Sequence, residues 1–193
     1  MSGEFNAEWI EELSSPDAQL RKEAAVQIYA AGRSLAEYAV HRWLAHRELA
    51  ELLGGEPSIT VGLAVAPDKF ARIREATGWP RLAEVPVEQD AVEFELHFEG
   101  NIALDVLTSR QPDGSGAIAK FLSKIGEGIQ QVEFRCSDVD RATAILRQHF
   151  AVNAVYRETR LGADGTRVNF FLAAGAGEKK VLIELYEPAP IRF

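Results

Sequence analysis

The strongest constraint on the fold is an order of elements that begins at residue 58 and occurs a second time further on. Apolar and small or polar side chains alternate over residues 59–65, which predicts a half-buried strand. Pro67 and Asp68 then open a stretch with apolar residues at helical spacing. Three further strands are predicted after that helix, at residues 82–88, 92–98 and 102–107.

The same order recurs in the second half of the chain. Residues 129–136 predict a strand, and Ser137 with Asp138 caps a helix that follows it. Three strands are again predicted, at residues 152–160, 166–173 and 181–186. A unit of strand, helix and three strands thus occurs twice with a period of roughly 70 residues. We therefore predict an α+β fold in which two βαβββ modules form a curled mixed sheet around a cleft.

The residues before the first module have a helical pattern instead. Ser15 and Pro16 are expected to start a second helix there, and Gly32 is expected to end or interrupt it. The breaker at residues 54–57 is the clearest boundary in the chain. The expected organisation has four parts: a helical segment at 1–55, a first module at 58–110, a linker with a short helix at 111–126 and a second module at 127–190.

The composition excludes several classes of protein. Hydrophobic residues make up 47% of the chain, which is enough for a packed core. The 29 acidic and 21 basic residues give a net charge of −8 with no basic stretch, so a nucleic-acid partner is not expected. Cys136 is the only cysteine, which excludes an intrachain disulfide. Since residues 1–5 show no signal-peptide pattern and no apolar run suits a membrane span, we expect a cytoplasmic protein.

Several stretches carry a resemblance to a known family. Residues 128–134 and 181–187 resemble the first and last strands of the second module of methylmalonyl-CoA epimerase, and residues 162–165 its preceding hairpin. Residues 60–65, followed by Asp68, are similar to the opening strand and helix cap of the first module. The resemblance covers about residues 58–188. It implies membership of the vicinal oxygen chelate superfamily, which includes glyoxalase I, extradiol dioxygenases and bleomycin-resistance proteins.

The resemblance implies a divalent metal ion in the cleft, held by one side chain from each of four strands. The matching positions in this chain are Thr60, Asp105, Gln131 and Glu184. The family has histidines at the first and third positions, where this chain has Thr60 and Gln131. Oxygen donors suit magnesium, calcium or manganese, whereas imidazole suits zinc, cobalt, nickel and iron. We expect the four side chains to converge on one point whether or not a metal is bound.

The strand at 129–136 places further polar residues beside Gln131. A period of two puts Glu133 and Arg135 on the same face, so Glu133 is a candidate acid/base or replacement ligand and Arg135 a candidate contact for an anionic substrate. The alternative is that Glu133 pairs with Arg135 and fills the cleft. Tyr186 and Asn169, together with Thr60, are the other candidate substrate contacts.

Two functions of different classes follow. The first is a glyoxalase-like protein that binds a small molecule in the cleft without the usual histidine metal site, as bleomycin-resistance proteins bind a ligand without chemistry. The alternative is a metal-dependent epimerase or lyase that acts on a small carbonyl or acyl-CoA substrate, with Glu133 and Glu184 as its catalytic carboxylates. Asp105, Gln131 and Glu184 would then be the metal ligands. In both cases the partner is a small molecule, and a homodimer is an open possibility.

Overall fold

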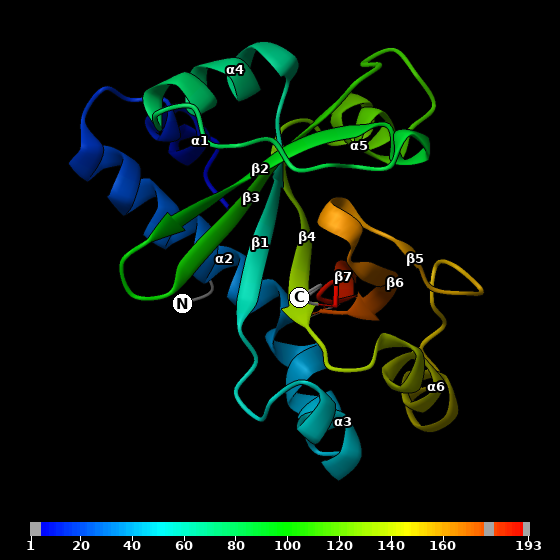
Figure 1. Cartoon of the computed structure of the whole chain (residues 1–193). Helices are drawn as coiled ribbons and strands as arrows, with labels where there is room; N and C mark the ends of the chain where they lie inside the picture. Colours follow the sequence, from blue (N-terminus) through cyan, green and yellow to red (C-terminus); the bar gives the residue numbers. More distant parts are fainter. Residues whose placement is uncertain (1–4, 176–179, 191–193) are drawn as a thin grey trace. The chain divides into compact units, whose positions relative to one another are not determined.

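The computed structural model describes residues 5–175 and 180–190 (Figure 1). Residues 1–4, which bear on the signal-peptide expectation, lie outside that part. The chain divides into two compact units, each made of two separate stretches. The first unit comprises Met1–Gly32 and Thr60–Gln130, and the second comprises Arg33–Ile59 and Gln131–Phe193. Within the described ranges, every helix is too short or too polar to cross a membrane.

The first unit contains a three-stranded mixed sheet and four shorter helices beside the start of α2. The strand order is β2-β3-β1, with β1 parallel and β2 antiparallel to β3. Both α4 and α5 contact β3. In chain order the elements are α1 (Glu8–Leu13), α2 (Ala18–Leu44, shared with the second unit), β1 (Ile59–Ala64), α4 (Pro67–Ala76), η1 (Val87–Gln89), β2 (Ala91–Phe98), β3 (Ile102–Ser109) and α5 (Ala117–Lys124).

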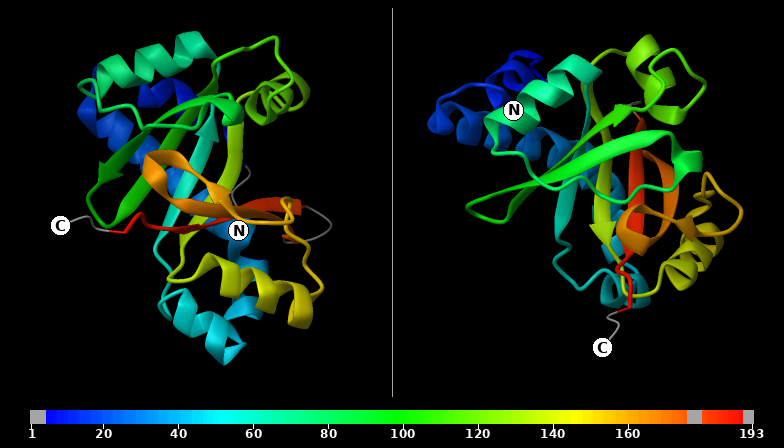
Figure 2. Two further views of the ribbon diagram at one scale, coloured as in Figure 1. Left: turned by 45° about the vertical axis from the view of Figure 1, so that its right-hand side comes forward. Right: turned by 45° about the horizontal axis from the view of Figure 1, so that its top comes forward.

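The second unit contains a four-stranded mixed sheet with the order β4-β7-β6-β5. Strand β4 is parallel to β7, and the remaining neighbours are antiparallel. Both views in Figure 2 show α6 lying along one side of β6 and β7. In chain order the elements are α3 (Arg47–Leu52), β4 (Gly128–Arg135), α6 (Val139–Phe150), β5 (Arg160–Leu161), η2 (Ala163–Gly165), β6 (Arg167–Ala174) and β7 (Lys180–Glu187). The predicted α+β class with mixed strands after an N-terminal helical segment is confirmed.

Each sheet has one apolar face that forms a core, because side chains alternate along a strand. In the second unit this face packs on Ile145 and Leu146 of α6, both almost completely buried. Each such side chain contributes about 1.5–3 kcal/mol through burial. The apolar face consists of Val61, Leu63, Phe94, Leu104 and Val106 in the first unit, and of Val132, Phe134, Phe171, Ile183 and Leu185 in the second. The opposite face of each sheet is therefore the one that is free to carry polar groups.

Helix α2 corrects the expectation for Gly32. The helix does not end or break there but continues from Ala18 to Leu44. The glycine serves close packing instead, because a Cβ at Gly32 would come within 2.5 Å of a Val61 methyl group. The start of the helix also differs, since it begins at Ala18 and the Asp17 carboxylate accepts the Gln19 N–H at 2.8 Å.

Two predicted strands are wrong, and they occupy equivalent places in the two repeats. Residues 82–88 are irregular and end in η1, with one backbone hydrogen bond from Ala83 N–H to the Glu93 carbonyl. Pro86 within this run cannot donate to a ladder. Residues 152–160 form an isolated bridge between Ala154 and Phe171, and only Arg160 at their end belongs to a strand, the two-residue β5. Apolar alternation is present in both runs, but neither run forms a continuous ladder of backbone hydrogen bonds with a neighbouring strand.

Ion pairs and caps fix the helices of the first unit around its sheet. Lys69 of α4 is buried and forms an ion pair with Glu11 of α1. Burial lowers the pKa of Lys69. The Glu127 carboxylate, which lies just before β4, accepts the Ala66 N–H at the start of α4 at 2.9 Å. These contacts tie the helix after β1 to the chain segment that leads into the second repeat.

Candidate functional site

The polar face of the second sheet gathers three of the candidate residues. Glu133 of β4 is paired in register with Glu184 of β7, so the two carboxylates lie on adjacent strands and on the same face. Gln131 lies two residues before Glu133 and therefore shares that face. Gln131 and Glu133 are 6% and 7% exposed. The alternation predicted from the sequence has thus placed an amide beside two largely covered carboxylates.

The Gln131 side chain bridges both carboxylates. Its Nε2 atom donates one hydrogen bond to Glu133 Oε1 at 3.0 Å and another to Glu184 Oε2 at 2.7 Å. An amide NH₂ group has two donors, and both are used here. Two ionised carboxylates on neighbouring strands repel each other, and the positive end of the amide dipole between them offsets part of that repulsion.

Arg135 and Tyr186 lie on the same face, two residues further along β4 and β7. They are paired in register on β4 and β7, next to the Glu133 and Glu184 pair. Arg135 is exposed. Within the described residues it forms no ion pair, so the alternative in which Glu133 pairs with Arg135 is not the arrangement present. The guanidinium therefore stands at the open side of the face, where it is accessible to an anionic group.

Asn169 lies on the opposite face of the sheet. It is paired with Leu185, which belongs to the apolar side, and it is completely buried. Its Oδ1 accepts the N–H groups of Phe170 at 2.9 Å and Tyr156 at 3.4 Å, and its Nδ2 donates to the Tyr156 carbonyl at 3.3 Å. The side chain thus holds the irregular segment 152–158 against β6. The structure does not bring it together with Gln131, Glu133 and Glu184.

The first unit carries its own polar face. Asp105 of β3 is paired with Gly62 of β1 and with Glu95 of β2, and Thr60 lies two residues before Gly62. Thr60 and Asp105 therefore share a face, and they are 7% and 5% exposed. His97 lies two residues beyond Glu95, and its Nε2 is 3.0 Å from Glu95 Oε2. Glu95 was not a candidate from the sequence, although its alternation with Glu93 and His97 was a usable signal.

The structural comparisons address the family. No protein-family model and no curated protein matches the sequence. Among solved structures, the methylmalonyl-CoA epimerase of Mycobacterium tuberculosis is 38% identical over 68% of this chain and 87% of its own, with a TM-score of 0.56. The chain belongs to the methylmalonyl-CoA epimerase family of the vicinal oxygen chelate superfamily. The resemblance seen in the sequence is therefore confirmed.

Other matches agree with this assignment. A variant of the Streptomyces coelicolor methylmalonyl-CoA epimerase, in complex with 2-nitronate-propionyl-CoA, is 27% identical over 68% of this chain and 96% of its own, with a TM-score of 0.54. A hypothetical protein from Bacillus halodurans is 23% identical over 69% of this chain and 95% of its own, with a TM-score of 0.56, and supports the fold alone. The shared part corresponds to about two thirds of this chain.

A methylmalonyl-CoA epimerase fold implies a metal ion, and the donor chemistry of this chain tests whether one fits. Carboxylate and amide oxygens suit a hard divalent cation such as Mg²⁺ or Mn²⁺. In the present geometry, however, Gln131 turns its nitrogen rather than its oxygen towards Glu133 and Glu184. The described residues contain no group of three or more histidine, cysteine, aspartate or glutamate side chains able to hold a metal. The donor types fit a hard cation, but their arrangement does not present them to one.

Cys136 does not add a nucleophile to the site. It directly follows β4, at a position that continues the face opposite Glu133, and it is buried. Burial raises the pKa of its thiol to about 11. The group therefore stays protonated at neutral pH and belongs to the packed side of the sheet.

Proposed function

We propose that this member of the methylmalonyl-CoA epimerase family is a small-molecule binding protein that works without the histidine metal site of the family. The observation that carries the proposal is the Gln131 amide between Glu133 and Glu184, at 3.0 and 2.7 Å. An amide with both N–H groups engaged supplies the partial positive charge that two adjacent carboxylates need. It does so at a position where the family has a histidine.

The ligand is expected to present a carbonyl or carboxylate group beside this cluster. Relatives with solved structures bind acyl-CoA compounds, among them methylmalonyl-CoA and 2-nitronate-propionyl-CoA. Arg135 is exposed and has no ion-pair partner within the described residues, so it is suited to a substrate carboxylate. Tyr186 adjoins it on β7 and offers a phenol to the same ligand. Thr60 of the first unit stays a proposed substrate contact, and Asp105 stays a proposed metal ligand.

Ligand binding in the presence and absence of metal tests the proposal. Methylmalonyl-CoA is titrated into chelator-treated protein by calorimetry, and the titration is repeated with Mn²⁺, Co²⁺ and Mg²⁺. The expected result is the same affinity in every case. Gln131→Leu is expected to weaken binding by about tenfold or more, because it removes the amide that holds the Glu133 and Glu184 carboxylates in place beside the ligand.

A matched control is available on the same strand. Gln130→Leu makes the identical change at a neighbouring position whose side chain points to the other face of β4, so it should leave the affinity within about threefold of the original. Binding that vanishes with chelator and returns with one metal would overturn the proposal. Equal losses for both variants would show that the effect does not come from the Gln131 bridge.

The alternative is an epimerase or lyase, and one observation favours it. Glu133 and Glu184 are two carboxylates side by side on a sheet face, as removal and return of a proton next to a carbonyl requires. In that case one carboxylate takes the α-proton of the acyl thioester, while Gln131 donates one N–H group to each carboxylate. A divalent metal, when bound, would stabilise the enolate formed. Deuterium uptake at the α-carbon of methylmalonyl-CoA in D₂O, lost in Glu133→Gln, would establish this activity.

A further inference from the structure

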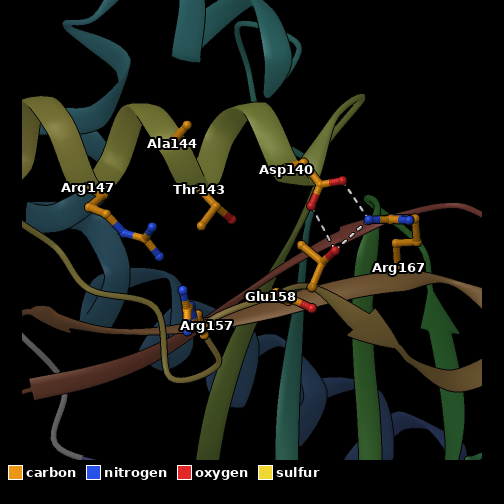
Figure 3. Close-up of a pocket in the computed structure, with 8 residues that line it drawn as sticks. Asp140, Thr143, Ala144, Arg147, Arg157, Glu158 and Arg167 are labelled. Carbon is orange, nitrogen blue, oxygen red and sulfur yellow. Dashed lines mark hydrogen bonds and ion pairs between the residues drawn. The ribbon is translucent and has the colours of Figure 1, made fainter.

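A hollow lies on the other side of the second sheet, away from the Gln131 cluster. Its volume is about 520 Å³. It is bounded by one face of α6, by residues 157–159 and by β6 (Figure 3). Arg167 of β6 shares the side of Asn169 and Phe171, which is the helix-covered side of the sheet. Its lining residues are Asp140, Thr143, Ala144, Arg147, Arg157, Glu158, Thr159 and Arg167.

One end of this hollow is closed by satisfied polar groups. Arg167 donates from Nη2 to Asp140 Oδ2 and to Thr159 Oγ1, both at 2.5 Å. Thr159 in turn donates to Asp140 Oδ1 at 2.8 Å. The Thr143 hydroxyl is also used, since it donates to the Val139 carbonyl at 2.7 Å. This end is a fixed wall in which the charge of Asp140 is matched by that of Arg167.

The other end carries two arginines whose charges are not matched. Arg147 of α6 and Arg157 of the facing segment both direct their side chains into the hollow (Figure 3). Neither guanidinium has an ion-pair or hydrogen-bond partner in the described ranges. Glu158 also lines the hollow, and it too forms no ion pair there. All ten guanidinium N–H donors of the two arginines are therefore available to a molecule from solution.

Other arginines of this unit, unlike Arg147 and Arg157, do have partners. Arg141, on the same helix, pairs with both carboxylate oxygens of Glu48 at 2.5 and 2.8 Å. Arg160 stacks over the Tyr156 ring at 3.6 Å from its centroid. Arg167 is paired with Asp140. Only Arg147 and Arg157, among the arginines named here, face one space from two different elements without an acceptor.

The geometry points to an anion site in which Arg147 and Arg157 hold the phosphate group of a small phosphorylated molecule. Two guanidinium forks facing one space match the several oxygens of a phosphate, and an anion between them removes the repulsion of two like charges. The hollow is large enough for a phosphate ester, because small-molecule pockets occupy about 300–1,000 Å³. The site lies on the opposite side of the sheet from the proposed acyl-thioester site. It is therefore a separate site and does not rest on the proposed function.

Nuclear magnetic resonance of the full chain tests this site. The arginine Nε–Hε signals are followed while inorganic phosphate, glycerol 3-phosphate or succinate is added at low ionic strength. Saturable shifts of the Arg147 and Arg157 signals with one common dissociation constant are expected for the two phosphate compounds. Tighter binding of glycerol 3-phosphate identifies an ester as the ligand class, and equal binding identifies free phosphate. Shifts that never saturate, or equal binding of succinate, would overturn the assignment.

Charge-neutral variants separate the site from general attraction of anions. Arg147→Gln and Arg157→Gln should each weaken phosphate binding by about tenfold or more. Arg160→Gln removes the same charge from the same segment but outside the hollow, and should change the affinity by less than about threefold. Thermal unfolding of each variant verifies that it is folded, which is expected because both arginines are exposed. Equal losses in all three variants would contradict a specific site.

Discussion

The polar faces of the two sheets accommodate their acidic side chains in different ways. In the second unit, two carboxylates on adjacent strands are joined by one amide, and Gln131 and Glu133 are almost fully covered. In the first unit, Glu95 and His97 form an exposed pair on the outer strand β2, and Asp105 is buried on the neighbouring strand β3. Solvent screens the Glu95 and His97 pair of the first unit. In the second unit, the Gln131 amide of the protein itself offsets the repulsion between the two carboxylates. On the face of the second unit, a single substitution at Gln131 therefore removes the group that offsets the repulsion between the carboxylates.

The difference also shows what duplication does and does not preserve. Strand order, pairing direction and the alternation of faces are alike in the two repeats. The polar side chains at matching positions are not, since Thr60 corresponds to Gln131 and Asp105 to Glu184. Backbone geometry places each face, and the chemistry of that face depends on individual side chains.

The largest effect is expected from Gln131→Leu. The change removes both N–H donors and leaves two neighbouring carboxylates without the amide that joins them. Losing hydrogen bonds to buried charged groups should lower the free energy of unfolding by about 2–4 kcal/mol. Urea denaturation measures this change from the shift in midpoint at constant slope.

Two further substitutions sharpen this comparison between the faces. Thr60→Val in the first unit should cost less than about 1 kcal/mol, because the Thr60 side chain has no hydrogen bond in the described part of the chain. Glu184→Gln keeps an oxygen for the Gln131 donor and should also stay within about 1 kcal/mol. A loss for Thr60→Val that equals the loss for Gln131→Leu would contradict the proposed difference between the faces.

A smaller effect is expected where each unit lacks its predicted second strand. In the second unit, Asn169 takes the place of a ladder by bonding both backbone groups of Tyr156. Asn169→Leu should therefore cost about 1–3 kcal/mol and raise amide exchange at Val155 and Tyr156. The matched change Asn153→Leu, at an exposed position of the same segment, should stay within about 0.5 kcal/mol. Unchanged exchange at Tyr156 in Asn169→Leu would refute this role.

The sequence was sufficient for most of the fold because its signals were local. Period-two alternation identified β1, β4 and β7, and the Asp138 cap placed α6, where Asp138 Oδ1 accepts the Arg141 N–H at 2.8 Å. Gly100 and Asn101, residue types typical of tight turns, join β2 to β3 and both have positive φ angles. The two wrong strands had the same alternation, but a strand also needs a partner, and alternation carries no information about pairing.

For the site, strand alternation predicted which residues share a face but not how their side chains are oriented. Register placed Gln131, Glu133 and Arg135 on one face, but the rotamer that turns the Gln131 nitrogen to both carboxylates depends on three-dimensional contacts. The convergence of Thr60 and Asp105 with Gln131 and Glu184 stays a prediction. Arg147 and Arg157 gave no signal at all, because the two lie on different elements and meet only through the packing of α6 on its sheet.

The smallest effect concerns one exposed ion pair in each unit. In the second unit, the hydrogen bonds from Arg141 lower the pKa of Glu48, and in the first unit the hydrogen bond from Lys22 lowers the pKa of Glu99. A carboxyl whose pKa is lowered in the folded protein adds stability above its ordinary pKa, and this stability is lost as the pH falls through the lowered value. Both contributions should therefore decline as the pH falls below about 5 and through the lowered pKa of each carboxyl.

The geometry decides which of the two pairs matters more. Arg141 holds both oxygens of Glu48 at 2.5 and 2.8 Å, whereas Lys22 reaches one oxygen of Glu99 at 2.5 Å. A bidentate guanidinium contact is the stronger arrangement for an exposed pair. The acid dependence of the unfolding free energy should thus flatten more in Glu48→Gln than in Glu99→Gln. Added salt should reduce both effects, since both pairs are open to solvent. The opposite ranking would mean that the contact between α3 and α6 is not the more acid-sensitive of the two.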